Sequence, residues 1–134
     1  MQGDPISTFG ESLDRCLADA GFLDRFYQHF MDSSPAIAER FVDTDFEKQK
    51  GALTQSLYLM VLAMQGGAAA IAYLDQVARR HGRTELNVEP QLYDIWLECL
   101  IRTVREHDPE FSDEIEQSWR QTMKFGIGLM RARY

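Results

Sequence analysis

Apolar residues recur every three or four positions along nearly the whole chain, which is the period of an amphipathic α-helix. Glycine, proline and short polar segments interrupt this pattern and divide it into separate helices. The sequence contains no run of alternating polar and apolar residues between turn residues, so strands are not expected. The pattern predicts about seven helices, at residues 6–20, 22–32, 35–41, 45–65, 69–81, 90–107 and 113–134. The predicted fold class is therefore all-α, with too many helices for a simple four-helix bundle.

Several of the predicted helix ends carry residues that favour a helix terminus. Pro35 suits the first turn of a short helix. Thr44 and Glu47 have the spacing of a capping box, in which a hydroxyl and a carboxylate each bind a free backbone N–H. Gly82 directly follows a predicted helix, as helix C-termini prefer. Ser112 precedes a first turn rich in acidic residues, which interact favourably with the helix dipole.

Length and composition indicate one globular domain, residues 1–134. A chain of 134 residues and 15.4 kDa buries roughly two-thirds of the surface that its unfolded form exposes. Hydrophobic residues make up 45% and charged residues 26%, which is an ordinary globular balance. The 14 basic and 21 acidic residues give a net charge of −7. An acidic chain without a basic stripe is a poor candidate for binding nucleic acid or an anionic membrane.

The sequence carries no signal for export or membrane insertion. Its first five residues lack the basic and apolar regions of a signal peptide. The longest apolar stretch, residues 57–64, is far shorter than the roughly 20 residues that span a bilayer. Cys16 and Cys99 each lie in an apolar helical stripe, so we expect two buried thiols rather than a disulfide framework or a zinc site. We therefore expect a cytoplasmic protein.

Three polar residues interrupt inward-facing apolar stripes, each on a different predicted helix: Tyr27, Gln49 and His81. Because core positions are normally apolar, such exceptions are candidates for function. Each also has an ordinary interpretation, as a core side chain whose polar atoms find a hydrogen-bond partner. We expect His29 to be solvated, because it lies across from the apolar stripe of its helix. We expect His107 to interact with the C-terminal end of its helix.

Together, the three exceptions match what a gas-binding haem pocket needs. An imidazole such as that of His81 can hold the haem iron. Two hydrogen-bond donors opposite it, here Tyr27 and Gln49, can interact with a partly negative bound oxygen while apolar neighbours keep the pocket dry.

Four segments in a fixed order carry a family resemblance. They are Phe26-Tyr27-Gln28-His29-Phe30 with Pro35 and Phe41, the segment from Phe46 to Leu53 with Gln49, Ala78-Arg79-Arg80-His81 with Val88 and Pro90-Gln91-Leu92-Tyr93, and Asp108-Pro109-Glu110-Phe111-Ser112 with Trp119. With these segments the chain resembles the globins, most closely the bacterial single-domain and sensor-type globins, from about Phe9 to Tyr134. The resemblance implies a three-over-three helical sandwich and a haem b cofactor.

The resemblance also implies roles for individual residues. His81 is then the proximal ligand of the haem iron, and we expect its other ring nitrogen to bind a backbone carbonyl near Val77. Tyr27 and Gln49 are the distal residues that bind the gas. The further haem-contacting residues are Phe41, Leu53, Val77, Val88, Tyr93 and Trp96. The candidate cations for the haem propionates are Lys48, Lys50 and Arg83.

The function that follows is reversible binding of a diatomic gas, O₂ first with NO and CO as further ligands, in oxygen transport or gas sensing. Two alternatives remain open. One is an NO dioxygenase that works with a separate reductase, and the other is a haem-free protein of globin fold that signals through partners. Sensor-type globins often pair through their last two long helices. The candidate residues for such a homodimer surface are Trp96, Trp119, Phe125 and Met130.

Overall fold

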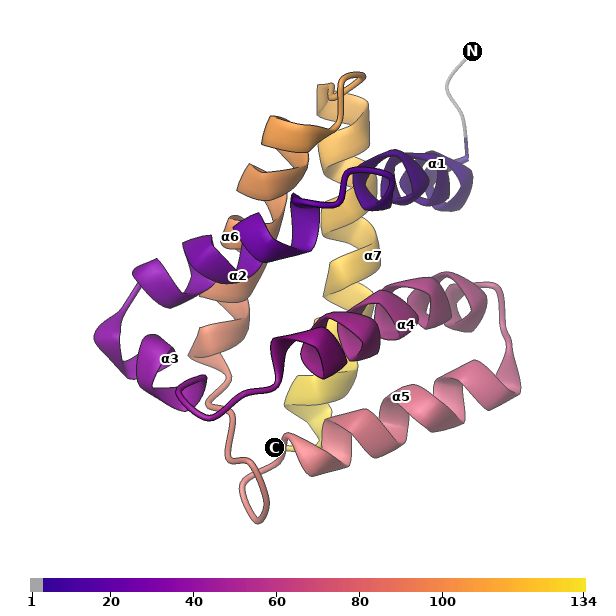
Figure 1. The fold of residues 1–134 in the computed structure, drawn as a ribbon. Helices are drawn as coiled ribbons and strands as arrows, with labels where there is room; N and C mark the ends of the chain where they lie inside the picture. The colour runs from indigo at the N-terminus through magenta and orange to yellow at the C-terminus, as the bar shows by residue number, and fades with distance from the viewer. Residues whose placement is uncertain (1–3) are drawn as a thin grey trace.

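The computed structural model describes residues 4–134, and these form seven α-helices (Figure 1). The helices are α1 (Pro5–Leu17), α2 (Phe22–Asp32), α3 (Pro35–Arg40), α4 (Phe46–Met64), α5 (Ala68–Arg80), α6 (Gln91–His107) and α7 (Asp113–Ala132). The predicted all-α class is confirmed. Residues 1–3, which belong to the segment examined for a signal peptide, lie outside the described residues.

The helix starts follow the capping signals in the sequence, with one correction. Ser112 caps α7, and its hydroxyl accepts a hydrogen bond from the backbone N–H of Ile115 at 3.3 Å. The start of α4 is capped by Asp45 rather than by the predicted Thr44, because Asp45 is the last residue with extended backbone. Its carboxylate accepts from the backbone N–H of Lys48 at 3.3 Å.

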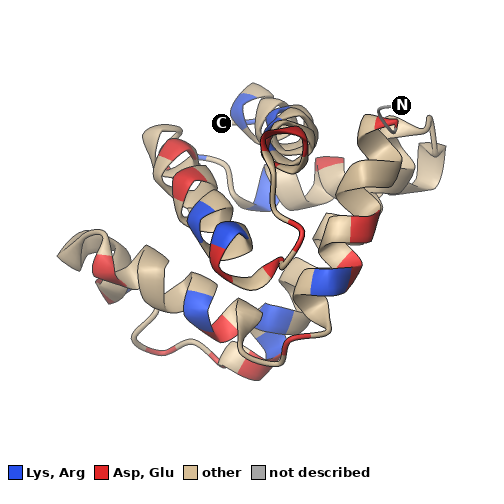
Figure 2. Cartoon of the chain, turned by 90° about the horizontal axis from the view of Figure 1, so that it is seen from above, with Lys and Arg blue, Asp and Glu red and all other residues tan. Residues whose placement is uncertain are grey.

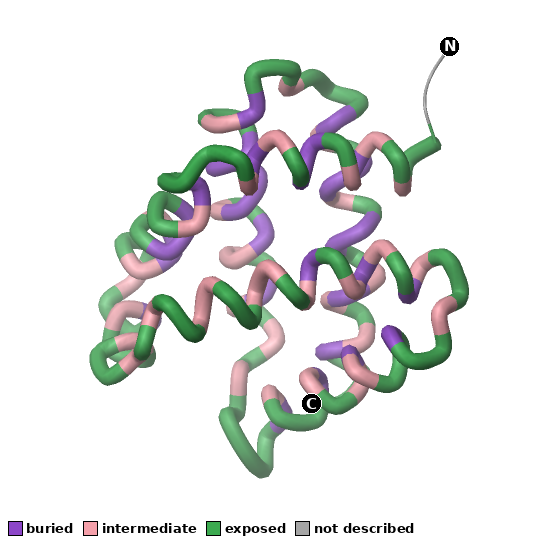
Figure 3. The backbone as a smooth tube through the Cα atoms, turned by 45° about the vertical axis from the view of Figure 1, so that its right-hand side comes forward, coloured by how far each residue is buried: buried purple, intermediate pink, exposed green. Residues whose placement is uncertain are grey.

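The helices form two layers in a three-over-three arrangement. One layer holds α1, α4 and α5, and the other holds α2, α6 and α7, while the short α3 joins α2 to the segment before α4 (Figure 1). The layers meet where α7 packs against α1, α4 and α5. Buried positions lie on the facing sides of the helices, and exposed positions lie outside (Figure 3). This arrangement leaves room between α4, α5 and α6, where the candidate site lies.

A buried polar network joins three helices at the far end of the core from the candidate site. The Asp108 carboxylate, at the end of α6, accepts hydrogen bonds from Ser12 at 2.6 Å and from Nε of Arg15 at 2.7 Å. The indole N–H of Trp119 donates to the Ser12 hydroxyl at 2.9 Å. The hydrogen bonds from Arg15 and Ser12 outweigh the effect of burial and hold the pKa of Asp108 below its usual value. The network therefore stabilises the packing of α1 against α6 and α7.

Two apolar side chains are less buried than their neighbours in the helix. Ile71 in α5 is 38% exposed, because the buried stripe of that helix runs through Ala70, Leu74 and Ala78. Cys16 is buried as expected, whereas Cys99 in the middle of α6 is half-buried. The Sγ of Cys99 lies 3.2 Å from the Ser33 hydroxyl. Both thiols are free.

The surface charges of the two signs are distributed over the same helices (Figure 2). Ion pairs such as Arg120 with Glu98 at 2.6 Å and Arg131 with Asp94 at 2.8 Å join α7 to α6 across the outer side of the fold. Of the helices in residues 4–134, none combines the length and the hydrophobicity that a membrane crossing requires.

Candidate functional site

A cavity of about 450 Å³ lies between the two layers and is lined from all helices except α1. The structure brings together around it all nine site residues that were named from the sequence. They come from helices α2 to α6 and the short segments beside them: Tyr27, Phe41, Gln49, Leu53, Val77, His81, Val88, Tyr93 and Trp96. Most of the wall is apolar, so its few polar groups determine what chemistry it supports.

The polar group on the α5 side is the His81 imidazole. His81 is the C-terminal cap of α5, and its Nδ1 lies 2.7 Å from the backbone carbonyl of Val77, as the sequence predicts. A carbonyl only accepts hydrogen bonds, so Nδ1 carries the hydrogen. In the neutral ring Nε2 therefore keeps a free lone pair, which is the form that binds metals.

The neutral form of His81 is favoured by its surroundings. Burial lowers the pKa of the imidazole, and the nearby charge of Arg80 lowers it further, while the hydrogen bond to Val77 acts in the opposite direction with a smaller effect. Because the net shift is downward from an ordinary value of 6.5, the ring is mainly neutral at pH 7.

The loop after His81 folds back on the end of α5. The backbone N–H of Val88 donates to the His81 carbonyl at 2.9 Å, and Asn87 has a positive φ of 50°. Gly82 is required at the start of this loop, because a Cβ there would lie 2.8 Å from the backbone oxygen of Arg133. The loop is braced from the opposite side, where the guanidinium of Arg40 donates to the Asn87 carbonyl at 2.8 Å.

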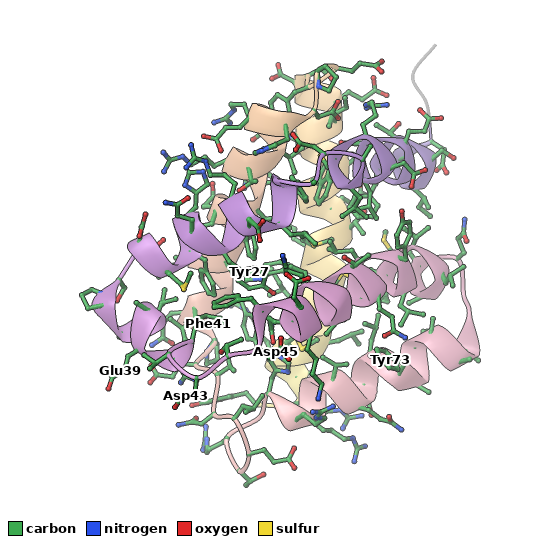
Figure 4. All side chains as sticks on the ribbon, in the orientation of Figure 1. Tyr27, Glu39, Phe41, Asp43, Asp45 and Tyr73 are labelled. Carbon is green, nitrogen blue, oxygen red and sulfur yellow. The ribbon has the colours of Figure 1, made fainter. Side chains whose placement is uncertain are left out.

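The opposite wall is built from aromatic side chains around Tyr27. The Tyr27 ring contacts the rings of Phe26, Phe41 and Phe46, at centroid distances of 5.0, 5.8 and 5.6 Å respectively. Each of the three phenylalanine rings is steeply tilted to the tyrosine ring. Tyr27 and Phe41 lie between α2, α3 and the start of α4, whereas Glu39 and Asp43 lie on the outside (Figure 4). The tyrosine ring is therefore fixed in position by its neighbours.

The hydroxyl of Tyr27 is the polar group of this wall, with Gln49 beside it. Tyr27 is only 4% exposed, and burial raises the pKa of its hydroxyl to about 12, with a smaller opposite effect from a hydrogen bond with Gln49. The hydroxyl is therefore protonated at neutral pH and can donate. Gln49 is half-buried in the first turn of α4, one turn before Leu53.

This set of residues fits a haem. The cavity offers an imidazole nitrogen with a free lone pair, mostly apolar walls with several aromatic rings, and two arginines in its lining, Arg40 and Arg80. A haem needs an axial ligand for its iron, apolar surroundings for its ring and cations for its propionates.

The other two histidines lie outside the cavity lining. The prediction of a solvated His29 is wrong, because α2 packs along α6. Its side chain is only 9% exposed, and Nε2 lies 2.7 Å from the Glu106 carboxylate. The Nδ1 of His107 binds the Thr103 carbonyl at 2.9 Å near the end of α6, in agreement with its predicted place at a helix end.

The arginines of the cavity lining were not identified from the sequence. Lys48, Lys50 and Arg83 were the candidate cations, but none of them lines the cavity. Lys50 pairs with acidic side chains outside it, and Arg83 lies over the ring of Tyr134. One sequence signal pointed to the right place, since Arg80 is the immediate neighbour of His81.

Two of the residues proposed for a dimer surface are buried within the chain. Trp119 is fully buried, with Phe9 packed against its ring at 4.7 Å, and Met130 is 8% exposed. They face inward because α7 uses this side to pack against the other layer. Phe125 is half-buried, and the half-buried Trp96 lines the cavity.

Comparisons with known proteins agree with this geometry. The sequence model of the globin family matches residues 13–127. A solved structure from Pseudomonas aeruginosa PAO1, that of protein PA3967, is described as structurally highly homologous to a human hemoglobin. It is 34% identical in sequence and superimposes with a TM-score of 0.92 over 98% of each chain. A search of curated proteins gave no match. The family model covers well over half of the chain, and the chain therefore belongs to the globin family.

Proposed function

We propose that residues 1–134 act as one globin domain that binds haem b at His81 and reversibly binds a diatomic gas. O₂ is the first candidate, with NO and CO as further ligands, in oxygen transport or gas sensing. One observation carries the proposal. A neutral imidazole, held by the Val77 carbonyl, lies in the wall of a largely apolar cavity that also contains the Tyr27 hydroxyl and the Gln49 amide.

On the α5 side, the chain supplies a preoriented ligand nitrogen. The hydrogen bond from Nδ1 to Val77 fixes both the tautomer and the plane of the ring. Burial keeps the ring neutral, so no proton has to leave Nε2 before it donates its lone pair. When bound, haem b would supply an iron that can coordinate the His81 nitrogen and a gas molecule.

On the other side, the chain supplies hydrogen-bond donors in a dry environment. The Tyr27 hydroxyl is protonated and its ring is fixed by aromatic neighbours, so it can donate to a partly negative ligand without reorganising. The Gln49 amide is a second donor. Hydrogen bonds to a charged or polarised acceptor are roughly twice as strong as neutral ones, which favours slow release of O₂.

The remaining lining residues hold the ring plane and exclude water. Phe41 lies beside Tyr27 and would be the aromatic side chain that packs on the haem, and Leu53 of α4 lines the same cavity and would contact it too. Val77, Val88 and Trp96 also line the cavity and would contact the haem from the side of His81. Burial of these apolar surfaces gives the binding energy that the iron bond alone does not supply.

A titration with haemin tests the proposal. Purified haem-free protein should develop a Soret band that saturates at one haem per chain. His81→Leu should fail to form this stable complex, whereas the matched variants His29→Ala and His107→Ala should saturate like the wild type. A folded His81→Leu that binds haemin with wild-type affinity would refute the assignment, as would loss of binding in either control.

A further inference from the structure

An ion pair joins the two helices that carry the proposed gas-binding donors. The ammonium group of Lys50, at the start of the second turn of α4, lies 2.8 Å from the carboxylate of Asp24 in α2. It also lies 2.9 Å from the carboxylate of Glu47 in its own helix. The Lys50 side chain is mostly packed, with 20% of it exposed, whereas 65% of the Asp24 side chain is exposed. The ion pair therefore lies at the outer edge of the contact between α2 and α4.

Few other contacts hold these two helices together in the described part of the chain. The helix α2 packs mainly against α3 and α6, and α4 packs mainly against α5 and α7. The start of α4 passes below α2 in Figure 1, and there the ring of Phe46 contacts the ring of Tyr27 at a centroid distance of 5.6 Å. A hydrogen bond between Gln49 and the Tyr27 hydroxyl is a further connection. The relative position of the two helices at the gas site thus depends on a few side chains.

The contacts between the two helices follow one another in antiparallel order. Asp24 and Tyr27 are three residues apart, so they lie on one face of α2. Phe46 and Lys50 are four residues apart, so they lie on one face of α4. Lys50 contacts Asp24, and one turn away Phe46 contacts the Tyr27 ring. Gln49 lies in the sequence between the two contact points of α4, and both points therefore determine its position relative to Tyr27.

We infer that Lys50 is a positioning residue for the gas site, and that it acts through its ion pair with Asp24. The inference rests on the proposed function, because the donors that it positions are those proposed to bind the gas. Without the pair, the start of α4 moves more freely relative to Tyr27. The Gln49 amide and the Tyr27 hydroxyl then point at a common acceptor for a smaller fraction of the time. Exposed ion pairs fix a geometry only modestly, so the expected effect is a few-fold.

Lys50→Met keeps the apolar stem of the side chain and removes its charge. In haem-free protein, amide hydrogen exchange of residues 50–53 should become roughly two- to fivefold faster, because the start of α4 opens more often. In haem-bound protein, O₂ release should accelerate by a similar factor, and CO release should change less because bound CO carries less negative charge. The infrared C–O stretch of the CO complex should shift to higher frequency, since a donor has moved away from the ligand. Asp24→Asn should reproduce these effects, and Lys50→Arg should restore the wild-type values.

Two control variants test whether the bond between the helices is the cause. Lys48→Met removes the same charge two positions earlier, from an exposed side chain that makes no ion pair in residues 4–134. Glu47→Gln breaks only the ion pair within α4. Both controls should release O₂ and CO like the wild type, with the C–O stretch unchanged.

Several results would overturn the inference. These are unchanged exchange of residues 50–53 in Lys50→Met, equal acceleration of O₂ and CO release, or the same effect in Lys48→Met or Glu47→Gln. Faster exchange with unchanged O₂ release would also overturn it, because the ion pair then stabilises the fold without positioning the donors. Failure of the proposed function is seen separately, as a wild-type haemin titration without a saturating Soret band, whereas failure of this inference leaves that titration intact.

Discussion

Replacing Tyr27 by phenylalanine removes one hydroxyl from the proposed gas site and leaves the packing in place. The tyrosine ring is 4% exposed and packs against the rings of Phe26, Phe41 and Phe46. Phenylalanine has the same aromatic ring and keeps these contacts. The substitution adds no atom, so it causes no steric clash. A change in O₂ release that exceeds the change in CO release therefore reports on the hydrogen bond.

The size of the effect follows from the state of that hydroxyl. Its pKa of about 12 means that it is a protonated donor at pH 7. A hydrogen bond to a charged or strongly polarised acceptor contributes about 1.5–3 kcal/mol. At 1.4 kcal/mol for each factor of ten, its loss should speed O₂ dissociation by roughly tenfold to hundredfold. Bound CO carries less negative charge than bound O₂, so CO dissociation should change by less than about threefold.

Stopped-flow replacement of O₂ by CO, and of CO by NO, measures the two dissociation rates in wild type and in Tyr27→Phe. Gln49→Leu should act in the same direction with a smaller effect, because a longer amide side chain holds its donor less firmly. Equal acceleration of both gases in Tyr27→Phe would refute the hydrogen-bond argument and assign Tyr27 a steric role. No change in either rate would remove it from the gas site.

Three further predictions concern stability and assembly. His29→Ala should leave haem binding unchanged and lower the free energy of unfolding in urea by no more than about 1 kcal/mol, because its partner Glu106 is 36% exposed. The lowered pKa of Asp108 stabilises the fold above its ordinary value of 3.8, and that contribution is lost as the pH falls through the lower folded value. The free energy of unfolding should therefore fall more steeply with pH below about pH 4. Asp108→Asn should lower the free energy of unfolding at pH 7 by about 3 kcal/mol at most, because hydration of the 25% exposed Arg15 offsets part of the loss of its charged partner. We propose that α6 and α7 form the surface of a homodimer, so sedimentation at micromolar concentration should show a dimer. Leu129 of α7 is half-buried, and Leu129→Glu should convert this dimer to a monomer.

The helices could be predicted from the sequence because local signals determine them. The bounds of α2 agree with the prediction at both ends, since Gly21 and the polar residues after Asp32 limit its apolar stripe. Local sequence does not determine which side of a helix the neighbouring helices cover. Ile71 and Trp119 are both apolar residues on helices, yet one is exposed and the other is fully buried, because the neighbouring helices decide which side is covered.

The candidate site shows the same division. Tyr27, Gln49 and His81 were identified because each is polar where its own helix should be apolar, which the sequence displays directly. The arginines of the cavity wall give no such signal, since an arginine near a helix end is ordinary. Arg40 reaches the cavity because α3 packs beside the loop that contains Leu86, a contact between residues 46 positions apart. Only the tertiary arrangement places it there.

The central claim is that the Nε2 lone pair of His81 binds the haem iron, and replacement of the side chain by free imidazole tests it most directly. His81→Gly removes the imidazole ring together with its Cβ, while the backbone carbonyl of Val77 stays available to a diffusible imidazole. With ferrous haem, this variant should lack the wild-type absorption spectrum and regain it on addition of millimolar imidazole. Resonance Raman scattering should show an iron–imidazole stretch in the wild type and in the variant with added imidazole. A His81→Gly protein whose iron–imidazole band persists without added imidazole would contradict the account.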